Sequence, residues 1–157
     1  MNVTRVDPPT AADERATLES FLDFARASVR HKCEGVSESD ARRCFGQAPE
    51  MSLAGIVSHL RWVEAAWFEV ALRGEKNRAD DFPGAPEVPL AHLVDEYEMQ
   101  CERSRQITRT LSLDTAVAED GVRFSVRWIL FHVLEETTRH LGQLDALRGL
   151  VDQAANA

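Results

Sequence analysis

Two ionisable side chains, Glu136 and His140, interrupt an otherwise apolar helical stripe near the end of the chain. They are four residues apart, so on a helix they lie one above the other on a single face. A carboxylate removed from water is costly unless a cation or a metal partners it. A histidine one turn away gives the geometry by which helices present two metal ligands. The apolar members of the stripe are Ile129, Val133, Leu144, Leu147 and Val151.

His59 is a third side chain with ligand chemistry, and it lies at the margin of another apolar stripe, between Val57 and Leu60. Packing of the two helices against each other would bring His59 to Glu136 and His140. Two imidazoles and one carboxylate leave a coordination position for water or substrate, and this set suits zinc and also iron, nickel or manganese. The predicted metal ligands are therefore His59, Glu136 and His140.

His132 is the main rival as a ligand, because it precedes Glu136 by one turn and lies within about 40° of it on a helical wheel. The spacing of these residues is also consistent with two interpretations in which no metal is bound. Glu136 and His140 can form a plain ion pair, and His59 can be a histidine that is hydrogen-bonded in the core.

Other notable side chains are assigned to the surface or to packing. His31 and His92 lie beside charged or boundary positions and are predicted to be solvated. The sequence contains no nucleophile elbow, phosphate-binding loop or CxxC motif. Three tryptophans at helical spacing are typical of packing, although one of them can line a pocket: Trp62, Trp67 and Trp128.

The elements that must position these residues are helices. Ser52 and Ser125 suit the N-cap positions of two of them. No alternating strand pattern of useful length is evident, so the predicted fold is an all-α four-helix bundle with long connecting loops. Apolar residues at three- and four-residue steps place the helices over residues 12–30, 52–73, 90–111 and 125–151.

The connections are marked by proline and glycine. Residues 76–89 contain Pro83, Gly84, Pro86 and Pro89, so they are predicted to be irregular, and a loop of this length often covers a site. Residues 113–123 form a second connection. Residues 35–49 form a third, with a short helical piece in it. Residues 1–10 are predicted to be a flexible arm of a single domain that spans residues 1–157.

Composition narrows the function classes. With 157 residues, 44% hydrophobic and 28% charged, the chain resembles one ordinary globular domain. The net charge of −8 disfavours binding to nucleic acid. The apolar runs are far shorter than the roughly 20 residues that span a bilayer, and no signal-peptide pattern opens the chain. Three unclustered cysteines suit reduced thiols, so we expect a cytoplasmic protein without a membrane partner.

Two segments together carry a resemblance to a known family: SLAGIVSHLRWVEAAWFEVALRGE, which contains His59, and RWILFHVLEETTRHLGQLDALRGLVD, which contains Glu136 and His140. The chain resembles the DinB-like superfamily of four-helix-bundle metalloproteins from its first helix to about Leu150. In that superfamily one histidine comes from the second helix and two ligands come from the last helix, before an HxGQ signature. Here the signature is His140-Leu-Gly142-Gln143.

Many DinB-like proteins have a histidine where this chain has Glu136. The glutamate version resembles the branch that contains mycothiol-dependent maleylpyruvate isomerase and the mycothiol S-transferases. The resemblance implies a divalent metal, most simply Zn²⁺ with Ni²⁺ or Fe²⁺ as alternatives, at His59, Glu136 and His140. It also implies mycothiol as a thiol co-substrate, an electrophilic small-molecule substrate and a detoxifying S-transferase activity.

The chain departs from the isomerase, which has an additional C-terminal domain for which these 157 residues leave no room. We therefore expect a shorter, single-domain member of the branch. The alternative function is a non-catalytic metal-binding stress or binding protein with the same fold. A homodimer is common in the family and is a further expectation. His132, Glu135 and Arg139 are candidates for supporting groups around the metal.

Overall fold

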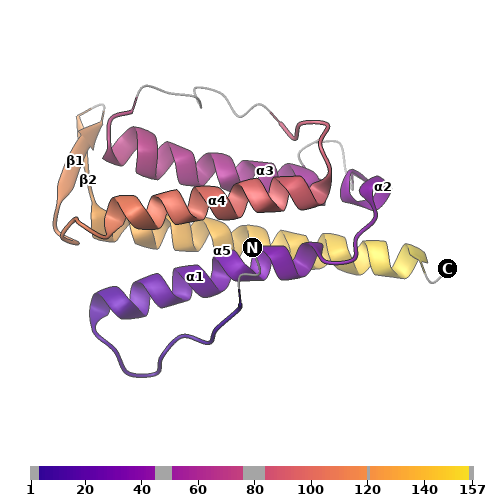
Figure 1. The fold of residues 1–157 in the computed structure, drawn as a ribbon, viewed down its shortest axis with the longest axis horizontal. Helices are drawn as coiled ribbons and strands as arrows, with labels where there is room; N and C mark the ends of the chain where they lie inside the picture. The colour runs from indigo at the N-terminus through magenta and orange to yellow at the C-terminus, as the bar shows by residue number, and fades with distance from the viewer. Residues whose placement is uncertain (1–3, 45–50, 76–83, 120, 156–157) are drawn as a thin grey trace.

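Four long helices form a bundle, as predicted. The computed structural model describes residues 4–44, 51–75, 84–119 and 121–155. The elements are α1 (Glu14–Cys33), α2 (Glu38–Ala41), α3 (Leu53–Glu64), η1 (Ala65–Leu72), α4 (Leu90–Thr108), β1 (Ala116–Glu119), β2 (Val122–Ser125) and α5 (Val126–Ala155). Figure 1 shows that the long helices lie side by side, with α2 at one end of the bundle and the two strands at the other.

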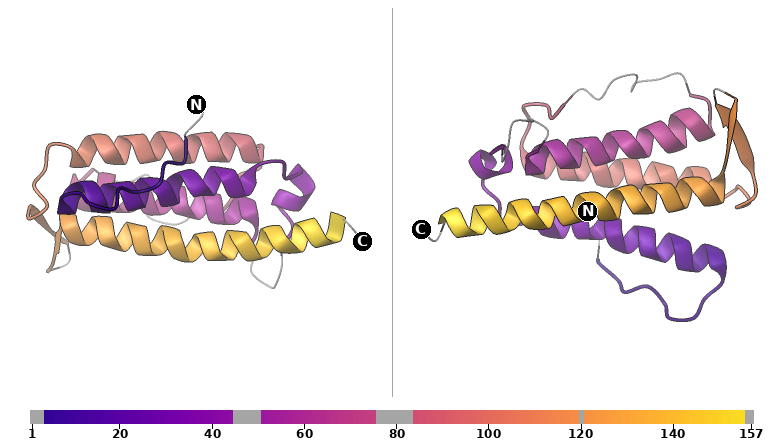
Figure 2. Two further views of the ribbon diagram at one scale, coloured as in Figure 1. Left: turned by 90° about the horizontal axis from the view of Figure 1, so that it is seen from below. Right: turned by 180° about the vertical axis from the view of Figure 1, so that it is seen from behind.

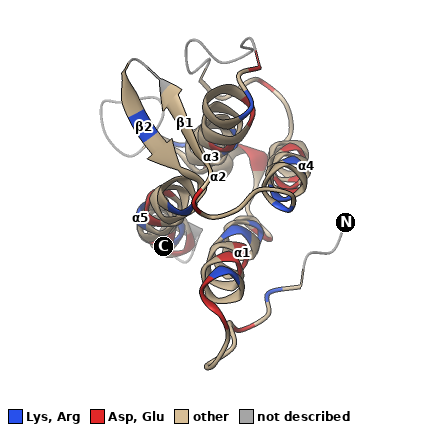
Figure 3. Ribbon diagram, turned by 90° about the vertical axis from the view of Figure 1, so that its left-hand side faces the viewer, with Lys and Arg blue, Asp and Glu red and all other residues tan. Residues whose placement is uncertain are grey.

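Seen from its end, the bundle has α5 between α1 and α3, and α4 on the side away from α5 (Figure 3). α5 spans the whole length of the molecule (Figure 2). One core cluster joins α3, α4 and the second half of α5, and the other joins α1, η1 and the first half of α5. The packing of α3 against α5 is what brings the candidate site residues together.

Local sequence signals set where the helices begin and end. The Ser52 side chain accepts a hydrogen bond from the Gly55 amide at 3.1 Å, which confirms the predicted N-cap before α3. The Ser125 hydroxyl accepts from the Trp128 amide at 3.1 Å in the same way at the start of α5. Gly74, with φ of 67°, follows η1 in the left-handed conformation that glycine adopts most easily.

The helix predicted over residues 52–73 is not α-helical throughout. From Ala65 to Leu72 it is a π-helix, η1, whose hydrogen bonds join residues five apart instead of four. Apolar periodicity cannot separate the two helix types over so short a segment, because both are built from the same apolar residues. The π-helix continues directly from α3, so the two form one rod with a change of helical pitch.

A β-hairpin corrects the expectation that the fold contains no strands. β1 and β2 are antiparallel, with Val117 opposite Phe124, inside a segment that was predicted to be mostly connection. Each strand has only four residues, too few for an alternating pattern to be recognised. The sequence does carry Asp-Gly at residues 120–121, a common hairpin turn, and Gly121 has a φ of 77°.

No helix in the described ranges is long and apolar enough to cross a membrane. Cys33, Cys44 and Cys101, all within the described ranges, form no disulfide. Cys33 and Cys101 are buried, and burial raises the pKa of the Cys33 thiol to about 12. These two thiols are therefore poor nucleophiles.

Candidate metal centre

His59 from α3 meets Glu136 and His140 from α5. One potential ligand atom from each residue lies within 4.8 Å of the other two, and all three side chains are partly buried. The rings of His59 and His140 have their centroids 4.7 Å apart. The structure thus brings together the three residues predicted from the sequence, from segments more than seventy residues apart.

The tautomer of His140 is set by a neighbour on its own helix. His140 Nδ1 lies 2.6 Å from Oε1 of Gln143, an oxygen that can only accept, so Nδ1 carries the proton. The other ring nitrogen, Nε2, then presents a lone pair and lies 3.4 Å from Oε2 of Glu136. With a neutral His140, this lone pair and the carboxylate oxygen form a pair of acceptors that suits a metal between them, whereas a protonated His140 would form a plain ion pair with Glu136.

The other carboxylate oxygen of Glu136, Oε1, is bound by a residue that is not one of the three candidate ligands. Oε1 accepts a charge-assisted hydrogen bond from the Arg139 guanidinium, which also pairs with Glu135 at 3.3 Å. The two oxygens of Glu136 therefore have separate partners, and Oε2 is directed at His140. Such outer partners orient ligating carboxylates.

Both histidines of the group are favoured in the neutral form. Burial lowers the pKa of His59, and the neighbouring His140 and the positive charge of Arg139 lower it further. Burial likewise lowers the pKa of His140, against the opposing effect of the hydrogen bond to Gln143. A neutral imidazole is the form that binds a metal, so these pKa shifts favour binding near neutral pH.

The rival ligand, His132, lies elsewhere. Its ring stacks on Trp128 at 4.8 Å with an interplanar angle of 13°, and it meets the edge of Trp67 at 4.8 Å. The ligand group found among the described residues does not include it. Within that part of the chain the group consequently offers three candidate protein ligands, the number typical of catalytic zinc sites, and not the four that close a structural one.

The other predicted residues fall where expected, with one part outside the described ranges. His31 and His92 have exposed side chains, paired with Glu34 and Glu96 respectively. The loop predicted to cover the site lies outside the described residues over 76–83. Its described end, Gly84, accepts a hydrogen bond from Ser58 at 2.9 Å, directly beside His59 in the sequence.

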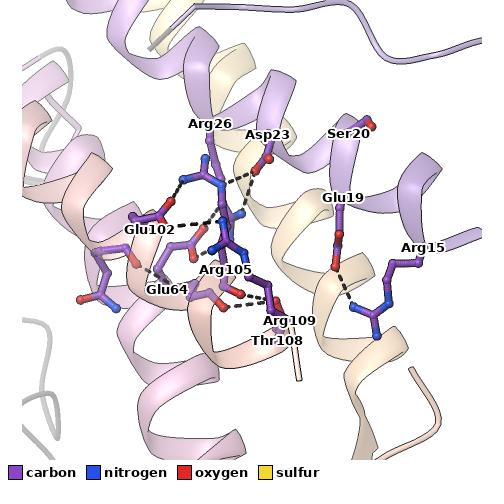
Figure 4. Close-up of polar contacts among 12 residues, drawn as sticks. Arg15, Glu19, Ser20, Asp23, Arg26, Glu64, Glu102, Arg105, Thr108 and Arg109 are labelled. Carbon is purple, nitrogen blue, oxygen red and sulfur yellow. Dashed lines mark hydrogen bonds and ion pairs between the residues drawn. The ribbon is translucent and has the colours of Figure 1, made fainter. Parts of the chain in front are cut away.

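A buried ion pair in the bundle was not predicted. Arg26 of α1 binds both carboxylate oxygens of Glu64 at the end of α3, with distances of 2.7 and 2.8 Å. Arg26 also binds Asp23 at 3.0 Å, and Arg105 binds Asp23 at 2.9 Å (Figure 4). Arg26 and Glu64 are 5% and 1% exposed, so these charges lie in the core.

The chemistry of the candidate ligands fits a divalent metal. Two neutral imidazoles and one carboxylate converge, their outer partners are in place, and the nitrogen lone pair of His140 faces a carboxylate oxygen. A four-helix bundle that carries such a group between its second and last long helices defines a class, that of the DinB-like bundles. Comparison with protein-family models then matches residues 17–153 to the mycothiol-S-transferase family. The chain belongs to this family, which is part of the DinB-like superfamily.

Comparisons with curated proteins and with solved structures found no match.

Proposed function

We propose that this protein is a divalent-metal-dependent S-transferase that joins a small thiol, of the mycothiol type, to an electrophile. The observation that supports this most is the half-buried group of His59, Glu136 and His140 in a chain of the mycothiol-S-transferase family. Three protein ligands leave room for a further ligand, as a catalytic site requires.

The metal would be held by the Glu136 carboxylate and by one ring nitrogen of each histidine. Zn²⁺ suits this ligand set best, and Ni²⁺ or Fe²⁺ are alternatives. When bound, the metal supplies Lewis acidity, which lowers the pKa of a coordinated thiol so that the thiolate is present at neutral pH.

The chain's own residues prepare the site for that chemistry. Gln143 fixes the proton of His140 on Nδ1 and leaves Nε2 as a ligand atom. Arg139 holds Oε1 of Glu136 and adds positive charge at the rim of the group, which favours an anionic sulfur nearby. Partial burial of all three ligand side chains reduces competition from water.

The reaction itself needs no cysteine of the protein. The sulfur of the thiol forms a bond to an electrophilic carbon, the leaving group departs with its electron pair, and the thiol proton passes to solvent. The two buried cysteines are unsuited to this step because their thiols are shielded and protonated. A thiol delivered as a small molecule is consistent with this arrangement, and the cytoplasm is the compartment that holds such thiols reduced.

Metal analysis and a thiol-dependent assay test the proposal together. The protein is purified without chelator, its metal content is measured per chain, and consumption of iodoacetamide is followed with and without mycothiol. We expect about one divalent metal per chain and turnover that needs both the metal and the thiol. His140→Ala should lose both, whereas His92→Ala, which alters an exposed histidine, should keep both.

Two results would contradict the proposal in different ways. Absence of metal, with none taken up from solution, would remove the metal centre altogether. A stoichiometric metal without thiol-dependent turnover would instead support the alternative, a non-catalytic metal-binding protein.

A further inference from the structure

We propose that a cluster of four rings, next along α5 from the candidate metal centre, binds the flat, conjugated part of the electrophile. The cluster, named here the ring platform, consists of Trp67, Phe124, Trp128 and His132. This inference rests on the proposed function for its substrate, but the platform itself is a feature of the described residues.

The four rings contact one another closely. Trp67 lies against Trp128 at 5.3 Å and against Phe124 at 5.4 Å between centroids. Phe124 and Trp128 are 4.9 Å apart, and His132 stacks on Trp128. Aromatic groups prefer stacked or edge-to-face neighbours at these separations, so a further flat ring would find favourable partners here.

The platform is continuous with the candidate ligands along α5. Trp128, His132, Glu136 and His140 follow one another at intervals of four residues, so they form a single slowly turning stripe. Each interval is about 6 Å of helix, given a rise of 1.5 Å per residue. His132 is thus the ring nearest the candidate ligands, about 6 Å of helix from Glu136, and Trp128 is about 12 Å from Glu136, so a substituent on a molecule reacting at the candidate ligands would meet His132 first.

Three separate elements build the platform. Trp67 comes from the π-helix η1, Phe124 from the strand β2, and Trp128 and His132 from α5. The hairpin lies beside η1 and the start of α5, at the end of the bundle where α5 begins (Figure 3). π-helical segments are rare and occur frequently at functional sites. The segment that departs from α-helical geometry thus supplies one of the rings.

The platform is accessible. Trp128 is 44% exposed although it contacts three other rings, and Trp67, Phe124 and His132 are partly buried. A protein partner would need a larger apolar surface, since stable interfaces use about 20 to 30 residues on each side. The large apolar side chains exposed at this end, among the described residues, are Val122, Trp128 and Phe131. A small ligand fits this area better than a second copy of the chain.

The chemistry of the rings indicates an aryl or similarly conjugated electrophile. Burial lowers the pKa of His132, so its ring is neutral near pH 7 and offers a flat, uncharged face like those of the tryptophans. Saturated groups would gain only the burial of apolar surface, whereas flat rings would add stacking, worth about threefold to tenfold in a binding constant.

A pair of unreactive probes tests binding without any turnover. N-phenylacetamide and N-cyclohexylacetamide share the same amide and differ in whether the ring is flat. Each is titrated into metal-free and metal-loaded protein while the indole N–H signals of the tryptophans are followed by NMR. We expect the phenyl probe to bind about threefold to tenfold more tightly in both forms, with shifts at Trp67 and Trp128.

A reactive pair tests the same preference in catalysis. N-phenyl iodoacetamide and N-cyclohexyl iodoacetamide present an identical reacting carbon, to which the thiol sulfur bonds as iodide leaves. Each kcat/KM is divided by the uncatalysed rate constant with the same thiol. The phenyl compound should be favoured threefold to tenfold. Trp128→Leu, which removes the ring on which His132 stacks, should reduce this preference, and Phe21→Leu, which alters an exposed ring on α1, should leave it unchanged.

The outcomes separate this inference from the proposed function. Equal binding of both probes, or thiol-dependent turnover without a ring preference, would overturn the platform and leave the S-transferase intact. Preferential binding of the phenyl probe without turnover would support the platform while the S-transferase fails. Circular dichroism checks that Trp128→Leu is folded. A change of its sedimentation from dimer to monomer would overturn the platform and assign these rings to an interface between copies.

Discussion

Glu64 and Glu136 are two carboxylates removed from bulk water in the same bundle, and their surroundings differ in kind. Glu64, 1% exposed, has both oxygens bound by the single guanidinium of Arg26. Glu136, whose side chain is 15% exposed, has one oxygen on Arg139 and the other facing the unprotonated nitrogen of His140. In the first site a guanidinium binds both carboxylate oxygens, whereas the second presents an oxygen and an imidazole nitrogen that suit a cation.

This difference separates a structural charge from a candidate metal ligand. In the Arg26–Glu64 pair both carboxylate oxygens are bound, and Arg26 also donates a hydrogen bond to Asp23 at 3.0 Å. Burial acts to lower the pKa of Arg26, but the attraction of Glu64 outweighs it and holds that pKa well above its usual value. Whether a carboxylate has partners for both of its oxygens, and not its burial alone, distinguishes Glu64 from Glu136.

The largest expected loss of stability comes from removing Arg26 from its buried pair with Glu64. Arg26→Leu leaves the Glu64 carboxylate buried without its partner, so the free energy of unfolding should fall by about 3–5 kcal/mol. Urea denaturation measures it. Adding Glu64→Leu should recover much of the loss. Arg109→Leu removes an exposed arginine whose ion pair with Glu102 is also exposed, and it should cost under about 1 kcal/mol. Equal losses for Arg26→Leu and Arg109→Leu would contradict this contrast.

The next largest effect comes from removing a ligand from the incomplete site. With zinc at 100 times its dissociation constant, the wild-type protein should gain about 2.7 kcal/mol of stability, because the metal binds only the folded chain. His140→Ala should abolish this gain and leave the helices formed. Thermal melts with zinc and with chelator measure it. An equal response of the two proteins to zinc would exclude His140 as a ligand.

A smaller effect should follow from loss of the residue that sets the tautomer of His140. Gln143→Leu removes the acceptor at Nδ1, and changes in such outer partners typically weaken metal binding about 10- to 100-fold. Competition with a chromophoric chelator gives the affinity. Gln106→Leu, at an exposed glutamine of α4, is the matched control. Unchanged affinity in Gln143→Leu would show that the tautomer is fixed by other means.

The smallest effect is a dependence of stability on pH. The pKa values of His59 and His140 are lower in the folded chain than the ordinary value of 6.5, so the folded chain binds fewer protons than the unfolded one just below that pH. The free energy of unfolding of metal-free protein should fall as pH drops below about 6.5 and level off beneath the lowered pKa values. Urea midpoints from pH 7.5 to 5 measure it.

A double variant locates the source of that pH dependence. His59→Gln with His140→Gln removes the two titrating rings of the site and should flatten the decrease, whereas Arg26 keeps its charge throughout this range. An identical decrease in the double variant would assign the effect to other groups, of which His132 is one because burial also lowers its pKa.

The sequence predicts much of this fold because its helices are long and periodic. Ser52 and Ser125 cap two of them as expected, and the stripe through Glu136 and His140 places both residues towards α3. His59 could be added because helix packing leaves few alternatives for a polar residue at the edge of a stripe. Metal binding by the three stays a prediction.

The remaining features depend on contacts between segments. The pairing of Arg26 with Glu64 joins two helices and leaves no signal in the spacing of either residue. The hairpin strands are too short for a pattern, although Asp-Gly at their turn could have indicated them. The spacing of apolar residues does not reveal a π-helix. The position of Trp67 in the ring platform therefore could not be predicted from the sequence.

The π-helix also begins between His59, a candidate metal ligand, and Trp67, a ring of the platform, so a mutation in it can affect one without the other. Its bonds take one residue more per turn than α-helical bonds do, and they begin after His59 and before Trp67. Loss of a single residue there, such as Ala66, would leave His59 in place and let the segment return towards α-helical bonding, which changes the residue that stands in the place of Trp67. A one-codon deletion would therefore alter the ring platform without altering the candidate metal ligands.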